Sequence, residues 1–124
     1  MVFDALEKSW GGELFVPKIP SYKIVDVATA IGSDCIQEEV GIRPGEKLHE
    51  QMISSEDSLS TFEYSDYYKI LPMINEWAKD NLRIKEGKKV PEGFVYSSDK
   101  NSEWMTKSDL QKWIDINQNY IGKI

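Results

Sequence analysis

An arginine and a glutamate three residues apart are the side chains best suited to binding chemistry in this sequence. Arg43 and Glu46 belong to an Arg-Pro-Gly-Glu segment that follows a partly apolar run. A guanidinium stays charged and offers paired, planar N–H donors, which suit a pyrophosphate. A carboxylate accepts hydrogen bonds, so Glu46 can accept them from vicinal hydroxyls such as those of ribose. The alternative is a surface ion pair that only braces the turn, and the spacing alone favours that alternative.

The remaining reactive side chains predict neither catalysis nor metal binding. His49 is the one histidine of the sequence, and a general base needs an orienting partner that the sequence does not identify. We therefore expect His49 to be structural or partly exposed. Cys35 is the one cysteine, which permits no internal disulfide and no cysteine-based zinc site. A single free thiol fits a reducing cytoplasm.

Short helices are expected on both sides of the Arg-Pro-Gly-Glu segment. Apolar residues at helical spacing predict a helix over residues 3–10, ended by a Gly-Gly pair. A second helix is expected between Ser21, a plausible N-cap, and Gly32, a natural stop. Thr106 and Asp109 form a capping-box-like pair, which predicts the start of a third helix.

Short strands are expected to complete the fold, and one of them leads into the turn at Arg43. The expected strands cover residues 13–16, 36–42, 64–71 and 94–96. Residues 47–53 suit either a strand or a helix. The aromatic cluster of Tyr64, Tyr67 and Tyr68 could stack on a uracil, but aromatic residues in strands more often pack, so we expect packing.

Composition describes one ordinary α/β domain. The chain has 124 residues, 40% of them hydrophobic, which allows a single modest core. A net charge of −6 argues against a protein that binds the phosphate backbone of nucleic acids. No apolar run approaches the length of a membrane span, and the start shows no signal-peptide pattern. A cytoplasmic location without nucleic-acid or membrane partners is therefore expected.

Two motifs together resemble the substrate-binding end of bacterial UDP-N-acetylglucosamine 4,6-dehydratases of the inverting type. They are GGELFVPKIPS at residues 11–21 and GIRPGEKLHE at residues 41–50. The resemblance extends over residues 3–113, and the pattern YSSDKNSEW at residues 96–104 is similar to a carboxyl-terminal clasp in which Trp104 would be buried. Those enzymes are extended short-chain dehydrogenases/reductases that serve capsule and flagellin-sugar biosynthesis.

The resemblance implies a fold and an activity for a longer parent enzyme. It implies an α/β fold, the C-terminal substrate-binding part of an extended short-chain dehydrogenase/reductase, with small sheets and flanking helices and without the Rossmann half. Residues 1–124 would form a single domain fragment, with residues 116–124 as a frayed tail. The parent would use NAD(P) to oxidise C4 of the UDP-sugar, eliminate water across C5 and C6, and return hydride to C6, with a 5-epimerising outcome.

Residue roles follow from the same resemblance. In the family, the matching arginine and glutamate contact the nucleotide-sugar, which assigns substrate binding to Arg43 and Glu46. No catalytic residue and no bound cofactor are expected in this chain. The tyrosine and lysine of Tyr96-x-x-x-Lys100 have the spacing of the superfamily's catalytic pair, but that spacing works on a helix, and the intervening Ser-Ser-Asp favours a turn. We interpret that match as chance.

Three functional hypotheses remain open from the sequence. The first is a catalytically inactive part of a UDP-N-acetylglucosamine 4,6-dehydratase that binds the UDP-sugar and forms a homo-oligomer, either through exposed apolar surface or through the assembly of the parent enzyme. The second is a stand-alone nucleotide-sugar-binding or oligomerisation module without catalysis. The third is a truncated product that retains only folding or oligomer contacts. All three hypotheses are compatible with the same motifs, so the sequence does not distinguish between them.

Overall fold

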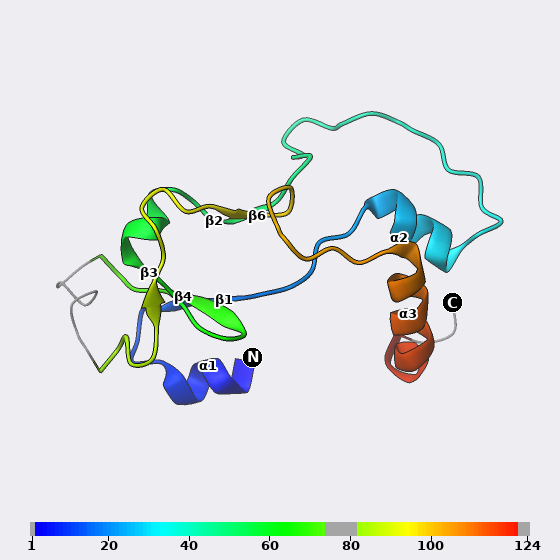
Figure 1. The fold of residues 1–124 in the computed structure, drawn as a ribbon. Coiled ribbons are helices and arrows are strands. Elements are labelled where there is room, and N and C mark those ends of the chain that lie inside the picture. Colours follow the sequence, from blue (N-terminus) through cyan, green and yellow to red (C-terminus); the bar gives the residue numbers. More distant parts are fainter. Residues whose placement is uncertain (1, 74–81, 122–124) are drawn as a thin grey trace. The chain divides into compact units, whose positions relative to one another are not determined.

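The computed structural model describes residues 2–73 and 82–121, which fall into two compact units. The first unit comprises residues 1–19 and 51–100, and the second comprises residues 20–50 and 101–124. The chain is α/β, with small antiparallel sheets and flanking helices, as expected (Figure 1). The single-domain organisation stays a prediction, because two compact units can still belong to one domain.

The main sheet of the first unit has four short strands. In spatial order they are β1 (Leu14–Pro17), β4 (Tyr67–Ile70), β3 (Thr61–Glu63) and β5 (Lys88–Lys89). All neighbouring pairs are antiparallel, and Ile70 aligns with Leu14 on one side and with Thr61 on the other. The expected strand over residues 13–16 is confirmed, whereas the expected strand over residues 64–71 is shorter because Tyr64 and its neighbours turn between β3 and β4.

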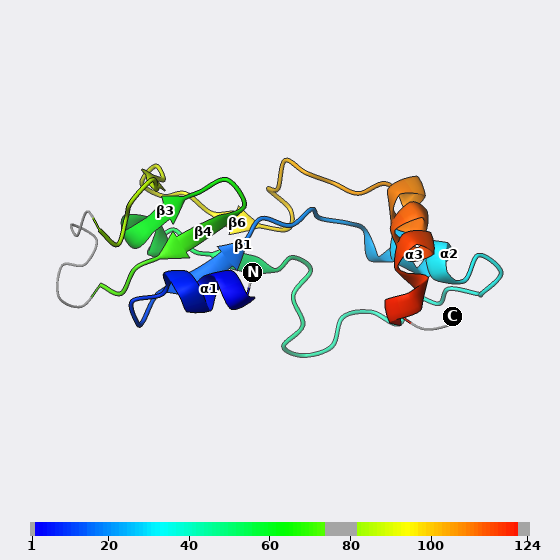
Figure 2. The same cartoon turned by 90° about the horizontal axis from the view of Figure 1, so that it is seen from below.

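Smaller elements complete this unit (Figure 2). They are α1 (Val2–Lys8), the 3₁₀ helix η1 (Asp57–Ser60) and a two-stranded sheet of β2 (Gln51–Ile53) and β6 (Tyr96–Ser97). The helix expected at the amino terminus is therefore present, but it ends at Lys8, and the side chains of Phe3 and Leu6 are exposed. The segment 47–53, which the sequence left open between strand and helix, forms a strand only over its last three residues.

The core of the first unit lies between the two sheets. It consists of Val16, Ile53, Tyr68, Ile70 and Val90, with Phe94 and Tyr96 packed against it. The Tyr68 ring meets the Phe94 and Tyr96 rings at centroid distances of 5.3 and 5.1 Å. Burial of apolar area is the main stabilising contribution to such a cluster. Packing of the strand tyrosines is confirmed, because Tyr67 and Tyr68 are both buried.

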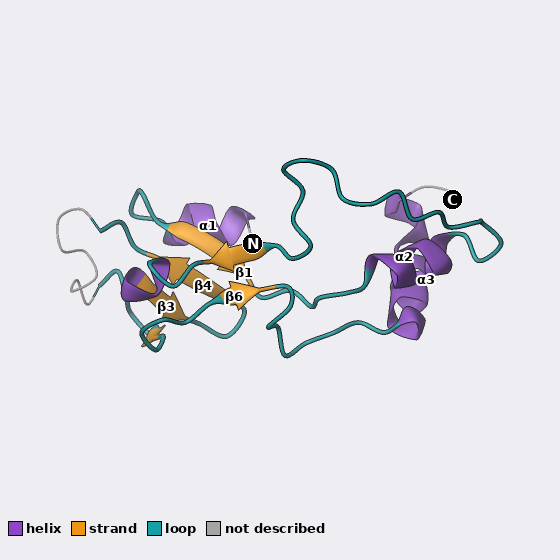
Figure 3. Cartoon of the chain, turned by 90° about the horizontal axis from the view of Figure 1, so that it is seen from above, coloured by secondary structure: helices purple, strands orange, loops and turns teal. Residues whose placement is uncertain are grey.

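The second unit contains helices and loops, and no strand is assigned to its described residues (Figure 3). Helix α2 (Ile24–Ile31) packs against α3 (Lys107–Ile121). The capping box at α3 is confirmed, since the Thr106 N–H donates to Asp109 Oδ2 at 3.0 Å and the Asp109 N–H donates to Thr106 Oγ1 at 3.3 Å. Helix α3 continues to Ile121. The tail that is expected to fray from residue 116 is therefore helical up to Ile121.

Two predictions for the second unit are wrong. Ser21 does not cap α2, whose N-cap is Lys23 without a side-chain hydrogen bond. The Ser21 backbone is instead committed to the neighbouring segment, because its N–H donates to Glu103 O at 2.9 Å and its carbonyl accepts from Met105 N–H at 2.8 Å. The strand expected over residues 36–42 does not form either. That segment is exposed and has no paired strand among the described residues, and an unpaired strand gains no ladder of hydrogen bonds.

Candidate functional site

The Arg43–Glu46 turn is closed by hydrogen bonds within itself. The Arg43 N–H donates to Glu46 Oε2 at 2.8 Å, and the Glu46 N–H donates to the Arg43 carbonyl at 3.0 Å. Arg43 Nε lies 3.7 Å from Glu46 Oε1, which completes an ion pair. Gly45 has φ +88°, a left-handed conformation that strongly favours glycine at this position. The local sequence therefore dictates a tight turn that holds the two side chains together.

The Arg43 guanidinium remains accessible in spite of this ion pair. The Arg43 side chain is 79% exposed and that of Glu46 is 49% exposed. An exposed ion pair of this kind contributes little to stability, about 0–1 kcal/mol. The ion pair thus braces the turn, as the spacing of the two residues predicts. It also leaves the charged, planar guanidinium of Arg43 accessible to a ligand.

A hollow of about 970 Å³ adjoins the turn within the same unit. It is lined by Ile24 at the start of α2 and by loop residues between 39 and 50, Glu46 among them, but not by Arg43 itself. Its lining includes three carboxylates, Glu39, Glu46 and Glu50, and a single ammonium, Lys47. This charge suits the hydroxyl groups of a sugar or ribose better than it suits phosphates, so any pyrophosphate contact here depends on Arg43.

Two other ionisable side chains, His49 and Lys18, show no sign of a site. His49 is exposed in the same loop, as expected. The Lys18 ammonium forms an ion pair with Glu63 at 2.8 Å and lies 5.0 Å from the centroid of the Tyr68 ring. Burial lowers the pKa of Lys18, but the hydrogen bond and the charge of Glu63 outweigh it, so the pKa is raised above its usual value. Lys18 is therefore a structural cation.

The Tyr96-x-x-x-Lys100 match is not on a helix. Tyr96 begins β6 and Lys100 lies in the following turn, where its N–H donates to the Ser97 carbonyl at 3.2 Å. The Tyr96 hydroxyl accepts from Ile19 N–H and donates to Ile19 O, both at 3.0 Å. A strand followed by a turn does not bring the tyrosine and lysine side chains together as one helical turn would. The interpretation of this match as chance is supported by the geometry.

Trp104 is less buried than the clasp resemblance implies. Its side chain is 46% exposed, so the expectation of a buried tryptophan is wrong. The indole Nε1–H donates to the Asn101 carbonyl at 2.8 Å, and the Trp104 backbone bridges to Ser21. Trp104 does hold residues 20–21 beside residues 101–105. It does so through backbone and indole hydrogen bonds at a partly exposed position, and not by packing into a hydrophobic core.

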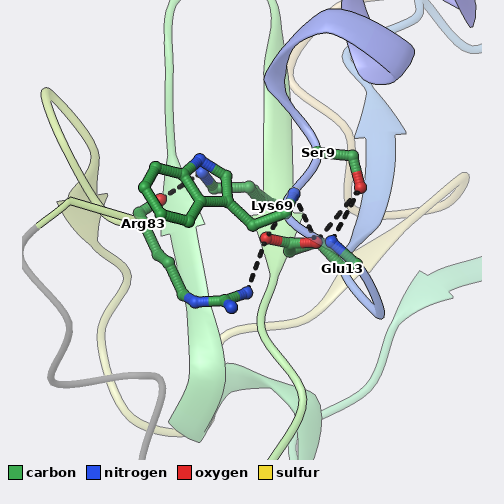
Figure 4. A network of polar contacts seen from close by, with 6 residues as sticks. Ser9, Glu13, Lys69 and Arg83 are labelled. Carbon is green, nitrogen blue, oxygen red and sulfur yellow. Dashed lines mark hydrogen bonds and ion pairs between the residues drawn. The ribbon is translucent and has the colours of Figure 1, made fainter.

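A buried ion network in the first unit was not predicted from the sequence (Figure 4). The Glu13 side chain has no exposed area, and its carboxylate accepts from Arg83 Nη1 at 3.1 Å. Burial raises the pKa of Glu13, but hydrogen bonds from backbone N–H groups and the Ser9 hydroxyl outweigh it and hold the pKa below its usual value. The Lys69 ammonium donates to the Arg83 carbonyl. The available signal was Lys69 itself, a charged residue inside an otherwise apolar strand.

The described residues do not fit a dinucleotide cofactor. A Rossmann site needs a parallel βαβ unit with a glycine-rich turn at the helix N-terminus. The paired strands in the described part of the chain are antiparallel, and the parallel pairing there is the isolated bridge between Ser21 and Trp104.

The described residues also contain neither a cluster of metal-ligating side chains nor a helix that could span a membrane. Among residues 2–73 and 82–121, no group of three or more His, Cys, Asp or Glu side chains could hold a metal ion. Within the same ranges, no helix combines the length and the apolar character that crossing a bilayer requires.

Two of the curated relatives that this chain matches carry the same name. The chain is 44% identical over 124 residues to a UDP-N-acetylglucosamine 4,6-dehydratase (inverting) of Campylobacter jejuni subsp. jejuni serotype O:2, covering 96% of this chain and 37% of the relative. It is 44% identical over 114 residues to the enzyme with the same name from serotype O:23/36, covering 88% of this chain and 34% of the relative. The chain thus spans little more than a third of the length of these relatives.

A solved structure supports the fold, and a family profile identifies the family. The X-ray structure of Pen from Bacillus thuringiensis is similar with a TM-score of 0.72 and 28% identity, covering 94% of this chain and 33% of that one. The profile of the polysaccharide biosynthesis protein family matches residues 1–72, which include both the Gly-Gly-Glu segment and the Arg43–Glu46 turn. The chain therefore belongs to the polysaccharide biosynthesis protein family.

Proposed function

We propose that this chain is the nucleotide-sugar-binding C-terminal part of an NAD(P)-dependent UDP-N-acetylglucosamine 4,6-dehydratase that serves surface polysaccharide or flagellin-glycan biosynthesis. The observation that carries the proposal is the 44% identity to inverting dehydratases across nearly the whole chain. The dinucleotide and the groups that move hydride and protons would belong to another part of the parent enzyme. The chain alone is then expected to form no 4-keto-6-deoxy product.

Arg43 and Glu46 are the substrate-binding residues in this proposal. Arg43 would contact the pyrophosphate, because its guanidinium is charged, planar and largely exposed. Glu46 would accept hydrogen bonds from ribose hydroxyls, because it lines the acidic hollow beside the turn. The ion pair between them is compatible with these roles, since an exposed pair costs little to rearrange when a ligand binds.

Calorimetric titration of the chain with UDP tests these roles. Wild type should bind UDP, and Arg43→Ala should weaken binding by about ten- to a hundred-fold, the worth of a charge-assisted contact. Arg43→Lys should recover part of the loss, because an ammonium lacks the bidentate geometry. Glu46→Gln should have a smaller effect, since the amide keeps one acceptor.

A matched control is an exposed cation outside the turn. Lys112→Gln removes an exposed charge from α3 and should leave UDP affinity unchanged. Equal affinities of wild type and Arg43→Ala for UDP would show that the turn only braces itself. The pyrophosphate role of Arg43 would then be rejected.

A stand-alone binding or oligomerisation module without catalysis is the second candidate function. It is favoured by the exposed apolar side chains of α1, which would let copies of this chain associate as a homo-oligomer. UDP binding is expected in both cases. The DNA that encodes the chain distinguishes the two candidate functions. A parent dehydratase requires a continuous reading frame that also encodes a dinucleotide-binding segment.

A further inference from the structure

A second hollow, of about 660 Å³, lies within the sheet-bearing unit, which does not contain Arg43. Its walls come from the end of α1, from β4 and from the turn over residues 82–86. We call it the cationic hollow, because four of its lining residues are the cations Lys8, Lys69, Arg83 and Lys85. A volume of this size is in the range that holds a small-molecule ligand.

The charge of the cationic hollow opposes the charge of the whole chain. The chain carries a net charge of −6, yet the four cations of this lining share it with one carboxylate, Glu86. The adjoining Glu13 is buried against Arg83 and offsets one further charge. Lys8 and Lys85 are exposed. Positive charge gathered in a hollow on an acidic protein attracts small anions.

Aromatic rings form the other part of the lining. The Tyr64 and Tyr67 rings are stacked, with centroids 4.7 Å apart and planes 10° from parallel, and Lys8 Nζ lies 5.4 Å from the Tyr67 centroid. The Trp10 side chain is 57% exposed, with the Arg83 guanidinium 5.5 Å from its ring centroid. Of these rings only the Trp10 indole is exposed, and an exposed ring beside cations is a combination on which a nucleobase stacks while its phosphate is held.

Buried contacts hold the wall of the hollow in place. Glu13 binds the Arg83 side chain and Lys69 binds the Arg83 carbonyl, so both ends of this residue are fixed (Figure 4). The Tyr64 hydroxyl is buried in the same wall and has no hydrogen-bond partner among the described residues. A buried hydroxyl without a partner is costly.

We propose that the cationic hollow binds a nucleoside phosphate, with the base on Trp10 and the phosphate held by Lys8 and Lys85. This site is separate from the UDP-sugar contacts proposed for Arg43 and Glu46, and it does not depend on them. Its ligand class follows from the combination of an exposed indole and exposed ammonium groups around one hollow.

Titration of the whole chain with AMP, and separately with inorganic phosphate, tests the proposal. AMP should bind with an affinity that falls as salt is raised, and phosphate should bind more weakly than AMP. The double variant Lys8→Gln, Lys85→Gln should lose at least about five-fold in affinity for both probes, as expected for exposed charge contacts. Trp10→Leu should lose about five-fold or more for AMP, the worth of one stacked base, and leave phosphate binding unchanged.

Two controls make the result specific to this hollow. Lys112→Gln removes an exposed charge elsewhere, and Arg43→Ala removes the other candidate phosphate contact, so AMP affinity should be unchanged in both. The lysine and tryptophan changes are at exposed positions, and circular dichroism should confirm that these variants fold. Absence of AMP binding at millimolar concentration would overturn the proposal. So would a loss of AMP binding in Arg43→Ala, or equal AMP affinity in wild type and Trp10→Leu.

Discussion

At the scale of single residues, the same side chain can brace a turn and remain available to a ligand. Arg43 is held through its backbone N–H and Nε by Glu46, while 79% of its side chain stays exposed. Tyr96 shows the opposite case, because its hydroxyl is fully engaged with the Ile19 backbone. A tyrosine that both donates to and accepts from the main chain is a structural residue, whatever sequence spacing it shares with catalytic tyrosines.

Tyr96→Phe is therefore expected to lower the stability of the chain. The change removes two hydrogen bonds that tie β6 to residue 19, which should cost about 1–2 kcal/mol in the free energy of unfolding. Urea denaturation of wild type and variant measures the difference. Tyr120→Phe, at an exposed position on α3, is the control and should be neutral. A Tyr96→Phe variant as stable as wild type would contradict the structural role.

At the scale of elements, the sequence predicted those whose signals are local and missed those that depend on partners. The capping box at Thr106, the Gly32 stop of α2 and the β1 strand follow from a few neighbouring residues, and the structure contains them. The strand expected over residues 36–42 has suitable residues but no partner strand in the described part of the chain, so this segment is a loop. The Glu13–Arg83 ion pair joins residues 70 positions apart, and no local pattern announces such a contact.

The Glu13 network predicts a pH dependence for the first unit. The pKa of Glu13 is lower in the folded state, so its stabilising contribution is present above the unfolded-state pKa and is lost as pH falls through the folded-state pKa. The free energy of unfolding of wild type should therefore decrease below about pH 4–5. Glu13→Gln should cost about 1–3 kcal/mol at neutral pH and show a weaker decrease on acidification.

Denaturation curves between neutral and acidic pH measure this effect. Glu38→Gln, at an exposed position in the loop, is the matched control and should follow the wild-type curve. If Glu13→Gln and wild type lost stability in parallel as pH falls, Glu13 would not carry the dependence, and the buried network would contribute little.

At the scale of the whole molecule, much apolar surface remains exposed. Phe3 and Leu6 on α1 are 82% and 72% exposed, although their spacing is that of a buried helical face. The chain matches little more than a third of its curated relatives, so its packing need not be self-sufficient. The apolar face of α1 can be predicted from its sequence. The surface that packs against this face cannot, because it depends on contacts beyond the helix itself.

Self-association of the isolated chain is expected from this surface. Phe3→Ser combined with Leu6→Ser should shift sedimentation velocity profiles towards monomer, because the two changes remove the largest exposed apolar side chains of α1. Ile116→Ser on α3 is a comparable change at another exposed apolar position and should have a smaller effect. A wild-type chain that sediments as a monomer at high concentration would contradict the prediction.

Chemical-shift mapping with UDP-N-acetylglucosamine tests the central claim most directly. In ¹H–¹⁵N spectra of the labelled chain, the nucleotide-sugar should shift backbone amides between residues 39 and 50, around the Arg43–Glu46 turn and the acidic hollow. The same shifts should be lost in Arg43→Ala and kept in Lys112→Gln. Unchanged amides in this loop at saturating nucleotide-sugar would contradict substrate binding by Arg43 and Glu46.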